Sequence, residues 1–353
     1  MFKHTINHLK GKGHVVDLII NSKDVLEELI KNEGWQYTNI FPEGRKIEGY
    51  HPYIGAFINT FRTIFRIEKF LWKHKRYDIY VTDDLLAVSG RLRFVPSFVL
   101  QDDDVTAVPE SALLHYFANH LLTPSVTDMK NNNHKKISFF GYKELGSLYP
   151  TRFSPDINKI RSFNPNNEKY FLLRLVSLKA THDINKTGLN NEDVKKLLSI
   201  LEKKGKVFIS SERALPEIYE KYRINIKPND ISHALYFAEL VISDSQTMSA
   251  ESGVLGTPYI RFNDFVGKLS YLEELENKYK LGFGVKTSEK EKLFEILEQL
   301  LNNDKLKEEW LLKKQIMINE KIDLTAFLIW LFENYPKSYK TIKEDINYQL
   351  KFK

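Results

Sequence analysis

The residues best suited to chemistry lie in one stretch, 238–263, which reads AELVISDSQTMSAESGVLGTPYIRFN. A continuous apolar run ends at Asp244, and the small polar residues Ser245 and Thr247 follow where a helix is expected to begin. The unpaired N–H groups and the dipole at the start of a helix favour a phosphate group. Glu251 lies inside that helix, and its carboxylate can accept two hydrogen bonds from a ribose diol. The stretch therefore predicts a nucleotide site; the alternative is an ordinary crossover with a capped helix.

Basic and polar residues follow two further expected strands. Arg174 lies at the end of one strand, and Lys179 and His182 lie in the loop after it. Arginine offers a fork of donors and lysine a point charge, and both suit a diphosphate. Ser211 and Glu212 follow the next strand, where they either line the same edge or cap the next helix. The alternative for the first loop is a solvated basic segment.

Acidic residues follow two expected strands in the first half of the chain. Asp83 and Asp84 end one of them, and residues 102–104, all aspartate, end the other. Glu110 and Glu144 are comparable candidates. A carboxylate at a strand end can act as general base for an acceptor hydroxyl. Aspartate is equally favoured at helix N-caps and in turns, so each of these residues also has a purely structural interpretation.

The composition narrows the class of protein. A length of 353 residues suggests about two domains. The absence of cysteine excludes a disulfide scaffold, a thiolate metal site and a cysteine nucleophile. The formal net charge of +6 suits an anionic ligand or a membrane surface but is too dilute to indicate nucleic acid. His4, His8 and His14 are irregularly spaced and no His-Glu-x-x-His pattern occurs, so we predict no metal site.

No secretory leader or membrane span is expected from the sequence. The first residues, MFKHTINHLKGKGH, lack the apolar core of a signal peptide. The longest strongly apolar stretch, 324–332, is much shorter than the roughly 18 residues that a span needs. We therefore expect a cytoplasmic protein, either free or peripheral on the inner face of the membrane.

Strand and helix patterns alternate along nearly the whole chain, which is typical of βαβ units with parallel sheets. The expected strands cover 14–22, 37–41, 78–84, 96–104, 169–177, 206–211, 239–245 and 257–264, and the clearest helices cover 53–75, 190–205 and 246–256. The first of these strands reads as one buried on both faces. A polar segment with three prolines, 144–169, indicates a linker. We predict domains at 1–150 and 165–320, with helices of 321–353 packing across the junction.

One expected helix has an unusual composition. Residues 57–76 read FINTFRTIFRIEKFLWKHKR and combine apolar side chains, among them Phe57, Phe61, Ile64, Phe65 and Trp72, with basic ones, among them Arg62, Arg66, Lys69, Lys73 and Lys75. Such a helix can lie on an anionic membrane. It can also be a crossover helix with a broad buried face, which is the interpretation we favour.

The segment 244–258, DSQTMSAESGVLGTP, resembles a motif of nucleotide-sugar enzymes. It is similar to the Asp-Ser-Gly-Gly-x-Gln-Glu-Glu…Leu-Gly-x-Pro segment of UDP-N-acetylglucosamine 2-epimerases. It is closer to the glycosyltransferase-like family of unknown function 354, whose Asp-Ser-x-Thr-Met-x-x-Glu…Leu-Gly-Thr-Pro segment is matched at Asp244, Ser245, Thr247, Met248, Glu251, Leu255, Gly256, Thr257 and Pro258. Further pieces that resemble this family are 139–150, 173–184, 206–212 and 265–283.

This resemblance implies an α/β, GT-B-like fold in which two Rossmann-like domains with parallel sheets face a central cleft. It implies a nucleotide-sugar-dependent glycosyltransferase that makes a surface polysaccharide or glycolipid, with the nucleotide sugar, a UDP-sugar, as substrate and no further cofactor. The second domain would hold the donor, with Glu251 on the ribose, Ser245, Gln246 and Thr247 on phosphate, Arg174 and Lys179 on the diphosphate, and Asp244, Ser211 and Glu212 beside them.

The first domain would hold a sugar or lipid-linked acceptor. Its catalytic carboxylate would come from Asp84, Asp102 or Glu144. His182 resembles a functional histidine of the 2-epimerases. Two alternatives stay open: a UDP-N-acetylglucosamine 2-epimerase-like enzyme and a non-catalytic nucleotide-sugar-binding protein.

The start of the sequence departs from the family pattern. Family members open with a strand and a small loop before a helix resembling HVHLFKHTINHLKxKGHxV. This sequence begins inside that helix, at Met1-Phe2-Lys3. We therefore expect the first strand of the N-terminal domain and its loop to be missing, unless an atypical strand order compensates.

Overall fold

The computed structural model describes residues 1–21, 25–45, 49, 52–177 and 188–353. The chain forms two compact units. The five-stranded unit comprises Met1–Lys3, Phe140–Phe327 and Gln349–Lys353. The four-stranded unit comprises His4–Phe139 and Leu328–Tyr348. The domain limits predicted from the sequence, and the packing of residues 321–353 across a junction, stay predictions.

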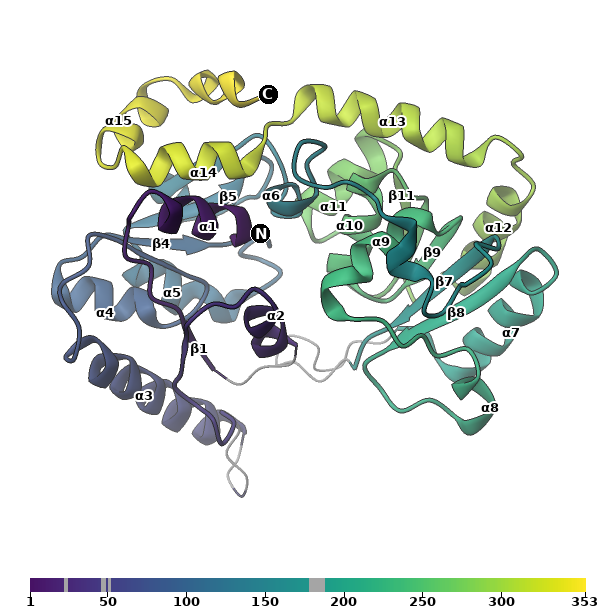
Figure 1. Cartoon of the computed structure of the whole chain (residues 1–353), viewed down its shortest axis with the longest axis horizontal. Helices are drawn as coiled ribbons and strands as arrows, with labels where there is room; N and C mark the ends of the chain where they lie inside the picture. Colours follow the sequence, from purple (N-terminus) through teal and green to yellow (C-terminus); the bar gives the residue numbers. More distant parts are fainter. Residues whose placement is uncertain (22–24, 46–48, 50–51, 178–187) are drawn as a thin grey trace. The chain divides into compact units, whose positions relative to one another are not determined.

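The five-stranded unit is built on a wholly parallel sheet in the order β11-β10-β9-β7-β8. Its elements, teal to green and then yellow-green in Figure 1, are α6 (Leu145–Leu148), β7 (Tyr170–Leu175), α7 (Asn191–Leu201), β8 (Lys206–Ser211), α8 (Glu217–Glu220), α9 (Ile231–Phe237), β9 (Leu240–Ser243), α10 (Gln246–Leu255), β10 (Tyr259–Phe262), α11 (Ser270–Glu273), β11 (Gly282–Val285), α12 (Lys290–Leu301) and α13 (Leu306–Glu320). The chain runs from β7 to β8 on one side and then returns to place β9 on the other side of β7. The strand order therefore reverses between β7 and β9.

Local sequence signals set the limits of the helices in this unit. Asn190 caps α7, because its side-chain oxygen accepts hydrogen bonds from the backbone N–H groups of Glu192 and Asp193, and Asp193 bonds back to Asn190. Gly256 ends α10 with a φ of 81°, a left-handed conformation that glycine adopts without steric cost. The predicted helices at 190–205 and 246–256 are confirmed in position.

The four-stranded unit carries a second parallel sheet, in the order β3-β4-β5-β6. Its elements are α1 (Lys3–Gly11), β1 (Ile19–Ile20), α2 (Leu26–Asn32), β2 (Thr38–Asn39), α3 (Pro52–Leu71), β3 (Tyr80–Thr82), α4 (Leu86–Arg93), β4 (Ser97–Leu100), α5 (Ala112–Phe117), β5 (His120–Pro124) and β6 (Lys136–Phe139), followed late in the chain by α14 (Leu324–Glu333) and α15 (Lys337–Glu344). Among the described strands of this sheet the order does not reverse. Its core is formed where α3 and α4 pack on β3, around Ile67, Leu71 and Val88.

Two expectations about the fold are wrong. Among the described residues, the expected buried strand at 14–22 is reduced to β1, which pairs with β2 alone, and Val15 is exposed. A strand is stable only where its backbone groups find a partner, and residues 15–18 lie outside the described ladders. The expected linker at 144–169 instead contains α6 and buried side chains such as Tyr149 and Ile160. The strands β5, β6 and β11 were not predicted.

The structure bears out only part of our interpretation of the aromatic helix. The helix α3 forms as expected, but its phenylalanines at positions 57, 61 and 65 are exposed. The buried face is instead made by Thr63, Ile67 and Phe70. In the part of the chain that the structure describes, no helix combines the length and the apolar content needed to cross a membrane.

Candidate functional site

The reversal of strand order brings Arg174 and Asp244 to one edge of the five-stranded sheet, the edge formed by the carboxyl ends of its strands. Arg174 on β7 lies opposite Ser243 on β9 in the parallel register. The backbone N–H of Asp244 donates to the Arg174 carbonyl oxygen at 3.3 Å. In open parallel sheets, ligands bind outside the carboxyl ends of the strands, at the point where the order reverses. This edge is therefore the first place to seek a ligand site.

The residue Ser245 starts α10 at this edge. The Ser243 hydroxyl accepts a hydrogen bond from the Ser245 N–H at 2.8 Å, and the Ser245 hydroxyl accepts one from the Met248 N–H at 3.3 Å. This N-cap satisfies one amide of the first turn. The N–H groups of Gln246 and Thr247 have no acceptor within the helix, as in any first turn. The start of α10 therefore offers amide donors and a positive helix dipole at the edge of the sheet.

Asp244 is a buried carboxylate. Its Oδ1 accepts a hydrogen bond from the Val176 N–H at 2.7 Å, and its Oδ2 lies 3.9 Å from Arg213 Nη1. A Cβ on Gly188 would lie 2.8 Å from that Oδ2, so the backbone at 188 passes directly against the carboxylate. Val176 and Gly188 flank residues 178–187, so Asp244 contacts the backbone on both sides of that segment. Burial raises the pKa of Asp244 to about 6, and the Val176 hydrogen bond and the Arg213 charge oppose the rise only in part.

Two charged groups, Arg174 and Glu212, lie at the same edge as Asp244. Arg174 donates from Nη1 to the Ser210 hydroxyl at 2.8 Å and from Nη2 to the Glu212 carboxylate. Glu212 also accepts a hydrogen bond from the Ser177 N–H at 3.3 Å. The Arg174 Nε is buried and has no hydrogen-bond partner among the described residues. Arg174 is therefore held in place by Glu212 and keeps unused donor capacity.

Glu251 lies on α10, in the second turn of the helix, and is partly exposed. Desolvation raises its pKa, and the positive charges of the Met1 amino group, Lys143 and Arg174 oppose that rise. Glu251 is thus close enough to Arg174 to sense its charge.

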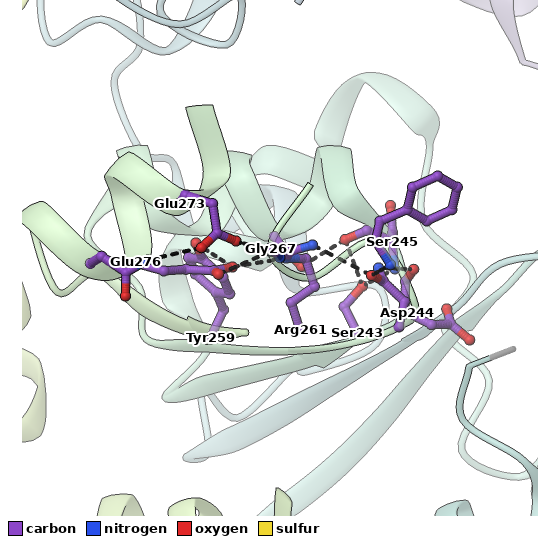
Figure 2. A network of polar contacts seen from close by, with 12 residues as sticks. Ser243, Asp244, Ser245, Tyr259, Arg261, Gly267, Glu273 and Glu276 are labelled. Carbon is purple, nitrogen blue, oxygen red and sulfur yellow. Dashed lines mark hydrogen bonds and ion pairs between the residues drawn. The ribbon is translucent and has the colours of Figure 1, made fainter. Parts of the chain in front are cut away.

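A network of polar contacts supports this edge from within the unit (Figure 2). Arg261 on β10 is fully buried and pairs with Glu276, from Nε at 2.8 Å and from Nη2 at 2.9 Å. Its Nη1 donates to Asn263 Oδ1 at 3.4 Å. Asn263 in turn donates from Nδ2 to the Asp244 carbonyl oxygen at 3.0 Å. A continuous chain of bonds therefore joins the buried ion pair to the end of β9.

The candidate residues of the four-stranded unit have different surroundings. Asp84 accepts hydrogen bonds from Arg45 at 2.7 and 3.3 Å, from Asn21 Nδ2 at 3.3 Å and from the Leu85 N–H at 2.8 Å. These four bonds fill the acceptor capacity of the carboxylate, which favours the structural interpretation of Asp84 over that of a general base. Asp102 follows β4 on the neighbouring strand, and its backbone oxygen accepts from the Thr127 hydroxyl at 2.8 Å.

Other predicted residues fall into three groups. Glu144 is buried at the start of α6, which packs on α10, so it belongs to the five-stranded unit. Ser211 closes a local turn with Arg213, donating to its carbonyl oxygen at 2.8 Å, as a turn residue does. Lys179 and His182 lie outside the described residues.

Among the residues that the structure describes, no group of three or more histidine, aspartate or glutamate side chains could hold a metal ion.

Sequence reasoning missed Arg213, Arg261 and Asn263. Arg213 directly follows the Ser211-Glu212 pair, so its position after β8 was the available signal. Its Nη2 donates to the Leu189 carbonyl oxygen. The roles of Arg261 and Asn263 had no comparable signal, because alternation along β10 does not tell a buried arginine from a solvated one.

The comparisons with known proteins place this geometry in a fold class. The sequence matches no family model and no curated protein, so its resemblance to family 354 stays a prediction. The structure is similar to a candidate UDP-N-acetylglucosamine 2-epimerase from Listeria monocytogenes, with a TM-score of 0.67 and 14% identity over 98% of this chain and 93% of that one. It is also similar to the UDP-GlcNAc 2-epimerase of Methanocaldococcus jannaschii in complex with UDP-GlcNAc and UDP, with a TM-score of 0.59 and 17% identity over 86% and 90% of the two chains.

A third similar structure is Acinetobacter baumannii MurG, with a TM-score of 0.54 and 12% identity over 94% of each chain. The protein therefore has an α/β fold with parallel sheets in two domains, of the GT-B-like class, as predicted.

Removing one partner of the buried ion pair tests how much the pair contributes to the stability of the fold. We expect Glu276→Ala to lower the free energy of unfolding by about 3 kcal/mol, because it removes both hydrogen-bonded oxygens from the buried Arg261 guanidinium and leaves it only the Glu273 carboxylate, 3.5 Å away, as a counter-charge. The double variant Arg261→Met/Glu276→Leu should recover most of that loss. Urea unfolding followed by circular dichroism measures both. Glu220→Ala, which breaks an exposed pair with Arg223, is the control and should leave the midpoint unchanged. An equal effect of Glu276→Ala and Glu220→Ala would contradict the assignment.

The buried carboxyl of Asp244 predicts a pH-dependent stability. Because its folded pKa of about 6 exceeds the ordinary 3.8, the folded chain binds an extra proton between these values. The protonated carboxyl therefore contributes to the free energy of unfolding near pH 4. This contribution, about 3 kcal/mol, is lost as the pH rises through 6. Asp244→Asn removes the ionisation and can keep the Val176 bond. We expect the variant to melt higher than the wild type near pH 8 and at the same temperature near pH 4. The control, Asp304→Asn at an exposed position, should differ from the wild type in melting temperature by the same amount at both pH values. A difference that is equally independent of pH in Asp244→Asn would refute the prediction.

Proposed function

We propose that this protein is a nucleotide-sugar-dependent glycosyltransferase, acting in the synthesis of a surface polysaccharide or glycolipid. The observation that carries the proposal is the reversal of strand order between β7 and β9, which sets Arg174 beside the start of α10. Cationic donors and helix amides then converge at the edge where parallel sheets bind ligands. The five-stranded unit would hold the donor.

The diphosphate of the donor would lie against the first turn of α10. Ser245, Gln246 and Thr247 would present the turn's hydroxyl and amide groups to it. Arg174 would add its guanidinium, and Arg213 is a second cation at the same edge. The Glu212 carboxylate now neutralises Arg174, so a bound diphosphate would share or replace that partner. Lys179 keeps its predicted role on the diphosphate.

The ribose of the donor would be held by Glu251. An ionised carboxylate accepts hydrogen bonds through both oxygens, which matches the two hydroxyls of a ribose. Arg174 and Lys143 favour the ionised form of Glu251 against its desolvation. The solved 2-epimerase structure in complex with UDP-GlcNAc and UDP has a similar fold, which supports a uridine nucleotide as the probe of choice.

The reaction would form a bond from an acceptor hydroxyl oxygen to the anomeric carbon while the bond from that carbon to the diphosphate oxygen breaks. Negative charge then develops on the leaving diphosphate, where the first turn of α10 and Arg174 would stabilise it. The proton of the acceptor hydroxyl would pass to a carboxylate, for which Asp102 and Glu144 stay candidates. The acceptor would be a sugar or a lipid-linked sugar.

A second candidate is a UDP-N-acetylglucosamine 2-epimerase-like activity. It is favoured by the TM-score of 0.67 with the candidate epimerase and by the shared Asp244–Glu251 spacing of the motif. His182 would then contribute to catalysis. A non-catalytic nucleotide-sugar-binding protein is the third possibility, and turnover separates it from both enzymes.

The proposed ribose contact can be tested by binding. A thermal-shift panel of nucleoside diphosphates first selects the base, with UDP expected to stabilise most. Calorimetric titration should then show that Glu251→Ala weakens UDP binding about tenfold to a hundredfold, because hydrogen bonds to a charged group are lost. Wild-type protein should prefer UDP over 2′-deoxy-UDP, and the variant should not.

The control for this experiment is Glu298→Ala, which removes an exposed carboxylate from α12. It should bind UDP as the wild type does. Unchanged UDP affinity in Glu251→Ala, or an equal loss in the control, would remove Glu251 from the site.

Turnover distinguishes the candidate activities. With UDP-N-acetylglucosamine alone, a transferase should release UDP only slowly, because water is a poor substitute for a positioned acceptor hydroxyl. An epimerase needs no acceptor and should convert the sugar at once. Proton NMR of the anomeric signals follows both reactions. Rapid conversion at carbon 2 without acceptor would replace the transferase proposal by the epimerase, and binding without any turnover would leave a nucleotide-sugar-binding protein.

A further inference from the structure

The helix α3 presents a row of aromatic rings to solvent. Phe57, Phe61 and Phe65 follow one another at intervals of four residues, which places them on one face of the helix, and they are 64%, 59% and 69% exposed. Trp72, just beyond the helix, is 80% exposed. The face that packs into the core is a different one, carrying Ile67 and Phe70. The aromatic side chains are therefore not needed to fill this core.

The end of α4 extends the same apolar region. Phe94 is 86% exposed and has a φ of 56°, a left-handed conformation that is uncommon for a bulky residue. Leu92 is exposed beside it, and the Arg93 guanidinium lies 5.6 Å from the centre of the Trp72 ring. Figure 1 shows α3 and α4 in the same unit, and the two helices pack together. We call Phe57, Phe61, Phe65, Trp72, Leu92 and Phe94 the aromatic surface.

The segments that carry the aromatic surface are strongly basic. Residues 52–76 and 86–94 contain eight lysine and arginine side chains against one acidic side chain, a difference of +7, where the whole chain has +6. Arg62 and Arg66 pair with Glu43, and Arg93 pairs with Glu68. The side chains of Lys69, Lys73 and Lys75 are exposed. A hollow of about 320 Å³ opens in this region. Lys75, Arg76 and Arg93 line it with positive charge, and Leu71, Leu92 and Phe94 give it apolar walls.

We propose that the aromatic surface docks on a bilayer that contains anionic phospholipids. The rings would enter the interface, and the lysines would reach the phosphates of the headgroups, as basic amphipathic helices do. A second copy of the chain fits less well, since protein interfaces are depleted in lysine and a twofold contact would bring like charges together. The proposal rests on α3 and α4 alone and does not depend on the proposed function.

Vesicle flotation of the full chain tests this proposal. We expect binding to vesicles of phosphatidylcholine with phosphatidylglycerol, weaker binding to phosphatidylcholine alone, and weakening by salt. The variant Phe61→Ser/Phe65→Ser/Trp72→Ser should lose at least about tenfold in vesicle affinity. Lys69→Glu/Lys73→Glu should lose the preference for phosphatidylglycerol. Since all these side chains are exposed, melting curves should match that of the wild type.

The control is Leu312→Ser/Ile316→Ser on α13, which removes two exposed apolar side chains elsewhere and should leave flotation unchanged. A blue shift of tryptophan emission on adding vesicles should vanish in Trp72→Phe while binding persists. The proposal fails if the aromatic variant floats as the wild type does, if the control loses as much, or if sedimentation shows a dimer that the aromatic variant abolishes while no vesicle binding occurs.

Discussion

A guanidinium buried inside a sheet has to be neutralised there, and the way Arg261 is neutralised sets the carboxyl edge of the five-stranded unit. Glu276 balances the charge of Arg261. The remaining nitrogen of the guanidinium, Nη1, donates a hydrogen bond to the side-chain amide oxygen of Asn263 and so holds that amide in place. That amide holds the Asp244 carbonyl oxygen, directly before the cap of α10. The position of the helix start, and with it the direction of its amides, thus depends on an ion pair that no ligand would touch.

The two units share an architecture but not an electrostatic environment. Asp84 and Asp244 both follow a parallel strand and precede a helix. Asp84 is bound bidentately by Arg45 and accepts a hydrogen bond from the Leu85 N–H just before α4, so its charge is satisfied at the surface of the unit. Asp244 is buried beside a strand-order reversal, and Arg213 approaches only one of its oxygens. The reversal, rather than the residue type, makes one edge suitable for an anionic ligand.

The aromatic residues of α3 show how far a hydrophobic pattern can mislead. Apolar side chains occur around most of this helix, so the pattern allows more than one buried face. The packing of α3 on α4 and β3 selects the face with Ile67 and Phe70 and leaves Phe57, Phe61 and Phe65 outside. The surplus of aromatic side chains then needs a reason other than the core, and their basic surroundings suggest a surface partner.

The sequence by itself determined what depends on near neighbours. Strands such as β7 and β9, the Asn190 cap and the Gly256 stop follow from local patterns, because caps and turns are decided within a few residues. The order of the strands, the pairing of Arg174 with Glu212 and the approach of Arg213 to Asp244 were decided only by tertiary structure. Parallel strands pair across long connections, so no local pattern encodes which strand lies beside which. The candidate site was visible in its residue types, but its geometry exists only where the sheet reverses its order.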